Sequence, residues 1–455
     1  MTRHGAPAAP QRYHRRVIAR RAGLAAFVAF VAVTVLAGPL VAGGLAQTAA
    51  PDAQTALERL VAPLYQRLAA AKGVAAPGPP PPVLVRSREE SRRFIQQELD
   101  RRYSPALLEQ ERKGMVAWGL IPPTYDVRKL FVDLMNEQIA AYYDPRGKVM
   151  VVGDWLTPVE QQAALLHELV HALQDRETSL DAFIAPTPGQ GDQLLARQAL
   201  IEGEAMALMF EVLLRAQGTD FAQLPDVDSF RTAIAAATVG PIVQQAPRFL
   251  RELLLFPYVE GLRFMHQFRQ RQPWSAAAAF YRDPPRSTSQ ILHPERRLDR
   301  RQDPLPIALP DLGAHVAGWP GAGEDELGEF AFAFVLGQAL GDADGKRVAA
   351  TWRGDRYRLW EDPQGGFGLV YLVATDGERA ATDLAVGLAR LVEHRHPALR
   401  GKSQNHAGAT LVSWADGGRG FAVERRGTDV LLIERMPAAR ADAVREAVWR
   451  SRPRP

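Results

Sequence analysis

Residues 165–175 read LLHELVHALQD, a run in which two histidines lie four positions apart among mostly apolar side chains. The preceding residues 157–160 read TPVE, which is typical of a helix start: the threonine can cap the helix, the proline fits its first turn and the glutamate completes a capping box. Because four residues make about one helical turn, His167 and His171 would project from one face, with leucines and a valine behind them.

Two imidazoles at this spacing can bind a single tetrahedral zinc ion. Glu168, directly after the first histidine, is placed to hydrogen-bond a metal-bound water and to accept its proton. The chain contains no cysteine, so any metal must be held by His, Asp or Glu, and disulfides and cysteine catalysis are excluded. The alternative is a structural helix whose histidines make ordinary hydrogen bonds.

A catalytic zinc ion usually has a third protein ligand. Residues 199–208 read ALIEGEAMAL, and helical phase places Glu202 alone on an apolar face, where a carboxylate is costly unless it is paired or bound to metal. Glu204 falls on a face with other charged residues, which indicates solvent exposure, and it is the reserve. Gly203 would let a second helix approach closely. We therefore expect Glu202 to be the third ligand.

The HELVH motif and the later IEGEA (residues 201–205) together resemble the gluzincin branch of zinc metallopeptidases, in which a glutamate on a later helix completes the site. Across residues 125–300, with YDPRGKVMVV before the motif and PPRSTSQILHPE after it, the chain is also similar to a group of poorly characterised exported bacterial metallopeptidases. The resemblance implies a zincin-like catalytic domain, a zinc cofactor and peptide or protein substrates. It also implies that Glu168 is the general base for hydrolysis by a zinc-activated water.

Gluzincins stabilise the oxyanion with a His or Tyr from a later segment. The first choice here is His293, in SQILHPE (residues 289–295), because site residues concentrate in polar loops such as this one. The other choices are His266, Tyr258 and Tyr281. A surface or structural role is the alternative for His293.

One feature departs from the family pattern. Thermolysin-like members carry an aspartate four residues after the glutamate ligand, where it orients the first histidine, and Met206 stands there in this chain. The groups that orient the imidazoles must come from elsewhere. Asp175 is a candidate, and a surface carboxylate is the alternative. The strand expected over residues 148–152 either pairs with an extended peptide or lies inside a sheet.

The pattern of apolar residues predicts an α+β protein. Its segments are a signal peptide or membrane anchor (residues 1–46), a helix and proline-rich spacer (47–86), a mostly helical zincin-like domain with a small sheet (87–300) and a small α+β domain of unknown role (313–455). The zincin-like domain is expected to contain a single clear strand, GKVMVVG at residues 147–153.

The N-terminus has the layout of an export signal. Six arginines and no acid occur in residues 1–46, and an uncharged run fills residues 22–46. That run is also long enough to remain as a membrane anchor. Because these arginines account for the net charge of +4, the rest of the chain is close to neutral, and nucleic-acid binding is not indicated. We expect the body to lie outside the cytoplasm, tethered or released.

Two rival functions remain beside the exported metallopeptidase. One is a non-enzymatic, membrane-anchored scaffold or interaction protein in which the HELVH helix is structural or binds zinc without turnover. The other is a zinc hydrolase that acts on a non-peptide amide. A metal site requires the ligand atoms of His167, His171 and Glu202 to surround one point, and a Glu202 that points elsewhere would favour the scaffold.

Overall fold

The computed structural model describes residues 53–452, apart from residues 76, 139–140, 238–239 and 407–408. The predicted signal peptide or anchor, residues 1–46, lies outside the described residues. Within the described ranges, no helix combines the length and the apolar character needed to cross a bilayer.

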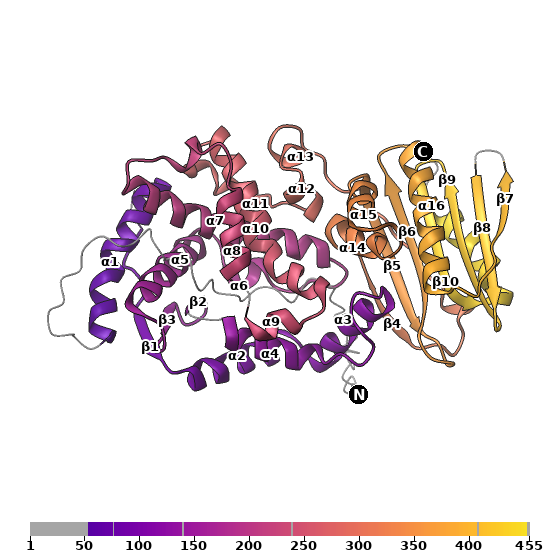
Figure 1. Ribbon diagram of the computed structural model, residues 1–455, viewed down its shortest axis with the longest axis horizontal. Coiled ribbons are helices and arrows are strands. Elements are labelled where there is room, and N and C mark those ends of the chain that lie inside the picture. The colour runs from indigo at the N-terminus through magenta and orange to yellow at the C-terminus, as the bar shows by residue number, and fades with distance from the viewer. Residues whose placement is uncertain (1–52, 76, 139–140, 238–239, 407–408, 453–455) are drawn as a thin grey trace, which may run out of the picture.

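A mostly helical region precedes a C-terminal α+β region, as the sequence predicts (Figure 1). The longer helices of the first region are α1 (Ala53–Lys72), α2 (Arg88–Arg102), α3 (Pro105–Ala117), α4 (Val127–Gln138), α5 (Pro158–Glu177), α7 (Gly191–Arg215), α8 (Asp228–Ala237) and α10 (Arg248–Arg271). Its shorter helices are α6 (Leu180–Phe183), α9 (Pro241–Gln245), α11 (Ala279–Arg282), α12 (Thr288–Leu292) and α13 (Glu295–Leu298).

A three-stranded sheet lies against α5 and consists of β1 (Val83–Arg86), β2 (Ala141–Asp144) and β3 (Val149–Gly153), in the order β1-β3-β2. β1 runs parallel to β3, and β2 runs antiparallel to it. The expectation of a single strand is wrong. α4 ends at Gln138, and the tyrosines at 142 and 143 lie in β2, because tyrosines favour strands and the turn at residues 145–148 joins β2 to β3.

The N-terminal helix packs onto the helices that carry the HELVH and IEGEA motifs. α1 contacts α5 and α7. Gln54 joins it to β1, since its Nε2 donates to Val83 O at 2.7 Å and its Oε1 accepts from Val85 N at 2.9 Å. The segment predicted as a helix and spacer therefore shares one hydrophobic core with the helical region.

The C-terminal region is built on a seven-stranded antiparallel sheet in the order β4-β5-β6-β10-β9-β8-β7. Its strands are β4 (Gly321–Asp325), β5 (Trp352–Glu361), β6 (Phe367–Thr375), β7 (Lys402–His406), β8 (Ala409–Asp416), β9 (Arg419–Arg426) and β10 (Asp429–Pro437). Its helices are α14 (Gly328–Leu340), α15 (Asp342–Ala349), α16 (Glu378–Arg395) and α17 (Ala441–Ser451).

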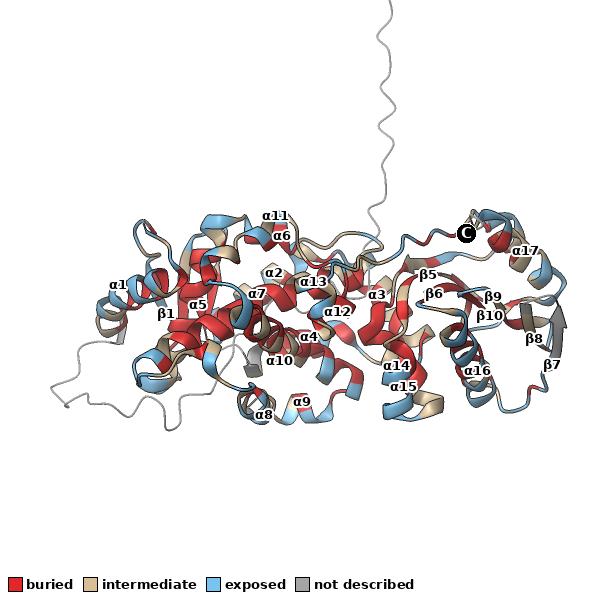
Figure 2. Ribbon diagram, turned by 90° about the horizontal axis from the view of Figure 1, so that it is seen from above, coloured by how far each residue is buried: buried red, intermediate tan, exposed pale blue. Residues whose placement is uncertain are grey.

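Helices cover both faces of this sheet (Figure 2). Alternate residues of β6 and β10 face opposite sides: Tyr371 and Leu432 join the core shared with α14 and α16, whereas Leu372 and Ile433 pack with α17. Four aromatic residues of this region are buried in the two cores, namely Trp352, Tyr357, Trp360 and Trp414. The larger core extends without a break from α1 to this sheet.

Candidate metal centre

The helix α5 begins as the TPVE sequence predicts. Thr157 Oγ1 accepts a hydrogen bond from Glu160 N at 3.4 Å, and Glu160 Oε2 accepts one from Thr157 N at 2.8 Å, which completes the capping box. Every side chain from residue 164 to residue 174 is buried. The two histidines and the glutamate of HELVH therefore lie inside the protein, where they need polar partners.

The two histidines and Glu202 converge. Glu202 Oε2 lies 3.3 Å from His167 Nε2 and 3.5 Å from His171 Nε2. One ligand atom from each residue lies within 4.8 Å of the other two, and no second group of this kind occurs in the described stretches of the chain. In a tetrahedral zinc site with bonds of about 2.1 Å, neighbouring ligand atoms are about 3.4 Å apart. The residues present therefore fit a tetrahedral metal ion.

The triad is almost fully buried. The side chain of His167 is 1% exposed, whereas those of His171 and Glu202 are 11% and 9% exposed.

Close packing of two helices positions Glu202 beside the histidines. α7 carries Glu202 and crosses α10 where Gly203 meets Gly261. A Cβ atom on Gly261 would lie 2.1 Å from the carbonyl oxygen of Ala199, so neither glycine leaves room for a side chain. The close approach expected of Gly203 is confirmed.

Residues of the triad stabilise one another electrostatically. Burial raises the pKa of Glu202, but His171 and His167 outweigh burial and bring the pKa down to about 2. Burial lowers the pKa of His171, and Glu202 outweighs burial in turn, so that this pKa rises to about 9. Glu202 is therefore ionised at neutral pH, as a carboxylate ligand must be.

Glu168 is buried beside the triad, with one carboxylate oxygen fixed by the backbone. Tyr143 N, in β2, donates a hydrogen bond to Glu168 Oε2 at 2.8 Å. Burial raises the pKa of Glu168 above its ordinary value, although His171 and His167 act against it. A raised pKa brings a carboxylate closer to the range of an efficient general base. Sequence reasoning missed Tyr143, because a backbone N–H leaves no side-chain signature.

Gln174, which sequence reasoning also missed, contacts His171 from behind. Gln174 Oε1 lies 2.7 Å from His171 Nδ1, and Gln174 Nε2 donates to Glu204 Oε2 at 3.1 Å. Glu204 is 1% exposed, so the prediction that it faces solvent is wrong. It pairs with Lys72 Nζ at 2.9 Å rather than with the histidines. The spacing of three residues from His171 to Gln174 on one helix is the signal that could have found this contact.

The structure gives Asp175 a different role from the one considered for it. Asp175 accepts hydrogen bonds from Tyr143 Oη at 2.9 Å and from Leu180 N at 3.1 Å, and it pairs with Lys148. It therefore ties the β2–β3 hairpin to the end of α5. The Nδ1 atom of His167 has no hydrogen-bond partner among the described residues.

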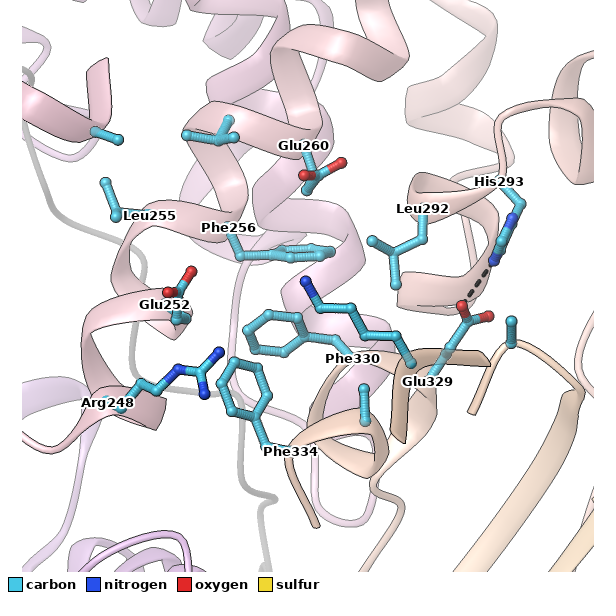
Figure 3. A pocket seen from close by; sticks show the side chains of 15 residues that line it. Arg248, Glu252, Leu255, Phe256, Glu260, Leu292, His293, Glu329, Phe330 and Phe334 are labelled. Carbon is cyan, nitrogen blue, oxygen red and sulfur yellow. Dashed lines mark hydrogen bonds and ion pairs between the residues drawn. The ribbon is translucent and has the colours of Figure 1, made fainter. Parts of the chain in front are cut away.

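His293 lies away from the triad, at a cavity of about 350 Å³ between α10, α12 and α14 (Figure 3). Its Nε2 atom is 2.7 Å from Glu329 Oε1. Phe256 of α10 lines the same cavity, whereas Tyr258 lies against His167. Two residues apart on a helix, these side chains point in nearly opposite directions. The cavity and the triad are therefore on different sides of α10.

The other three residues considered as oxyanion donors have distinct surroundings. The ring centroid of Tyr258 lies 6.4 Å from that of His167. His266 is buried, with its Nε2 atom 3.1 Å from a backbone carbonyl oxygen. Tyr281 donates its hydroxyl hydrogen to Glu204. Tyr258 is thus the one of these residues that contacts a triad member.

Comparisons with known proteins concern the C-terminal region. A family model described as "Domain of unknown function (DUF8575)" matches residues 316–445, which run from just before β4 into α17. No curated protein and no solved structure matches the chain. The matched residues contain neither the triad nor Glu168, which lie in the helical region.

Proposed function

We propose that this protein is an exported zinc-dependent metallopeptidase, in which His167, His171 and Glu202 bind zinc and Glu168 is the general base. The observation that carries the proposal is the pair of distances from Glu202 Oε2 to the two imidazole nitrogens, 3.3 and 3.5 Å, which match the edges of a tetrahedral zinc site. A buried carboxylate next to that site supplies the proton acceptor that hydrolysis needs.

The chemistry divides between the metal and the protein. A bound zinc ion would polarise a water molecule and lower its pKa towards about 7. Glu168 would accept a proton from the attacking water and pass it to the leaving amine. The hydrogen bond from Tyr143 N holds one oxygen of Glu168 and leaves the other available for this transfer. Tyr258, beside His167, is better placed than His293 to stabilise the developing oxyanion.

The edge of the small sheet favours an extended peptide as substrate. β3 has a neighbour on each side, so the strand considered for peptide pairing is internal, whereas β2 pairs with β3 alone among the described strands. Tyr143 N donates away from β3 towards Glu168, and in an antiparallel pair the residue two positions earlier, Ala141, faces the same way. A peptide lying along β2 would therefore pass the general base.

The export component of the proposal is independent of the catalytic one. It rests on the arginine-rich start and the uncharged run at residues 22–46. Reporter fusions after residue 90 test it. An alkaline-phosphatase fusion should be active and a cytoplasm-dependent reporter silent, and the opposite result would place the body inside the cell.

The catalytic proposal is tested with Glu168→Gln, which keeps the shape of the side chain and removes the base. The variant should retain zinc and lose about 10²- to 10⁴-fold in cleavage of a peptide library. Glu89→Gln makes the same chemical change at an exposed position of α2 and should leave cleavage unchanged. Equal activity of the native protein and Glu168→Gln would remove Glu168 from the mechanism. A zinc-loaded native protein that cleaves no peptide would favour the hydrolysis of a non-peptide amide instead.

A further inference from the structure

A buried ionic cluster lies behind the metal site and begins on the N-terminal helix. Lys72, in the last turn of α1, is 2% exposed. Its Nζ atom lies 2.9 Å from Glu204 Oε1 on α7 and 2.8 Å from Glu177 Oε1 on α5. Burial lowers the pKa of Lys72, but the two glutamates outweigh burial and raise it above its ordinary value. The cluster therefore holds a permanent ammonium between the two helices that carry the metal ligands.

The cluster continues to His171 through Gln174. The second oxygen of Glu204, Oε2, accepts hydrogen bonds from Gln174 Nε2 at 3.1 Å and from the hydroxyl of Tyr281. Gln174 Nε2 also donates to Ile201 O at 3.0 Å. On the other side of the amide, Gln174 Oε1 lies 2.7 Å from His171 Nδ1.

These contacts permit only one direction of hydrogen bonding. A backbone carbonyl can only accept a hydrogen bond, so Ile201 O requires the amide nitrogen of Gln174 on its side. The amide oxygen must then face His171, and it too can only accept. Hence Nδ1 of His171 carries a hydrogen, and Nε2, the nitrogen that faces Glu202, is the atom that would bind a metal ion after losing its own proton.

We infer that Lys72 is a positioning residue for the metal centre, and that it acts on His171 through Glu204 and Gln174. This inference rests on the proposed metal site. The ammonium of Lys72 pairs with one oxygen of Glu204, the other oxygen of Glu204 holds the amide of Gln174, and Gln174 fixes the tautomer and rotation of the His171 ring. The corresponding atom of His167, Nδ1, lacks a partner among the described residues, so the cluster acts on one of the two histidines.

The inference assigns a function to a segment that the sequence alone predicts only as a helix and proline-rich spacer. α1 ends at Lys72, and Gly73, with a φ of +80°, turns the chain away towards the prolines at 77 and 79–82. The helix thus contributes one charged side chain to a site formed by α5 and α7. A protein lacking α1 would retain all three proposed ligands and lose the group that orients one of them.

Zinc affinity of the full chain tests the inference. Lys72→Met removes the charge and keeps an unbranched side chain, and it should weaken zinc binding about 10- to 100-fold in a chelator competition assay. The spectrum of the cobalt-substituted protein, which reports ligand geometry, should shift. Lys129→Met is the matched control, because Lys129 is 72% exposed, and it should change neither readout.

A double variant tests the route. If Lys72 acts through Gln174, adding Lys72→Met to Gln174→Met should weaken zinc binding no further than Gln174→Met alone. Full additivity would overturn the route. Should Lys72→Met not fold, Glu204→Gln serves instead and should also weaken binding about tenfold or more.

The outcomes separate this inference from the proposed function. If Lys72→Met or Glu204→Gln lowers thermal stability while zinc affinity and the cobalt spectrum stay native, the cluster is only structural and the inference is wrong. If the native protein binds zinc but cleaves no peptide, the proposed peptidase function is wrong and the inference about Lys72 still stands. A native protein that binds no zinc would overturn the metal site itself.

Discussion

Gly203 of α7 lies against Gly261 of α10, and a Cβ atom on Gly203 would fall 2.3 Å from the carbonyl carbon and oxygen of Gly261. Protein interiors are close-packed, so a side chain at either position must push the helices apart. Because Glu202 directly precedes Gly203, the spacing between these helices sets the position of the proposed third ligand. The contact between Gly203 and Gly261 therefore determines both the packing of the two helices and the geometry of the proposed metal site.

Gly203→Ala should accordingly damage both. We expect a loss of about 1–3 kcal/mol in the free energy of unfolding and zinc binding weakened at least about tenfold. Gly337→Ala, inside α14, is the control, since a Cβ atom there meets its nearest foreign atom at 3.6 Å and alanine favours helices. Denaturant unfolding and chelator competition measure the two effects. Native zinc affinity in Gly203→Ala would show that Glu202 tolerates displacement of its helix.

Removal of the metal should destabilise the protein. A ligand present at about 1,000 times its dissociation constant stabilises the folded state by about 4 kcal/mol, and a chelator should remove that contribution. Thermal unfolding with and without chelator measures it, and elemental analysis should find about one zinc per chain. For Glu202→Ala and for His167→Ala, the chelator should not change the unfolding temperature. Full zinc retention in both variants would rule out this ligand set.

Local patterns predicted the features of the site that lie on single helices. The capping box at Thr157, the spacing of His167 and His171, and the apolar surroundings of Glu202 each depend on residues within one or two turns, so the sequence reports them directly. The same reasoning failed for Glu204. Its neighbours along α7 are charged, which indicated solvent, whereas its partner Lys72 comes from a helix far earlier in the chain.

The missed strand β2 has a related cause. Its residues continue the apolar spacing of α4, and a short apolar run fits either structure until its partners are known. Pairing with β3 decides the matter, and it also turns Tyr143 N towards Glu168. Tertiary partners, which no local pattern encodes, thus determined both the small sheet and the environment of the proposed base.

The junction between the two regions offers a test that does not involve the metal. Gly328, at the start of α14, has a φ of +67°, and a Cβ atom there would lie 1.8 Å from the carboxyl group of Asp192 on α7. Gly328→Ala should cost at least about 2 kcal/mol of unfolding free energy, from backbone strain and from displacement of Asp192. Gly321→Ala, with no atom within 4 Å, should stay within about 0.5 kcal/mol of the native value. Equal stabilities of the two variants would contradict the close contact.

Several carboxyl groups are buried near this junction. Burial raises the pKa of Asp192 and Glu111 well above their ordinary values and also raises that of Asp355. Asp192 has hydrogen-bond partners, such as Thr288 N at 3.0 Å, whereas neither oxygen of Glu111 has one among the described residues. Glu111 also lies near a second acid, Asp325, which raises its pKa further.

These shifts predict how stability depends on pH. In the unfolded chain such groups ionise near their ordinary values, about 4, whereas in the folded protein they hold their protons to higher pH. Folding therefore binds protons, and the stability that these groups contribute is present below about pH 4 and is lost as the pH rises through the folded pKa values. Groups with a lowered pKa, such as Asp362 at about 2, change the stability only below about pH 4, where they gain protons.

Glu111→Gln isolates one of these groups. Glutamine has nearly the same shape as glutamate and carries no charge at any pH. Between about pH 5 and about pH 8, the unfolding free energy of the variant should therefore fall less than that of the native protein. At the upper end of this range the variant should be the more stable of the two. His171 and Glu168, whose pKa values are also raised, act equally in both proteins and cancel in the comparison. Glu89→Gln, at an exposed position, should reproduce the native pH dependence. If Glu111→Gln and the native protein lose the same free energy over this range, Glu111 is already ionised in the fold, and a cation that the described contacts do not include must accompany it.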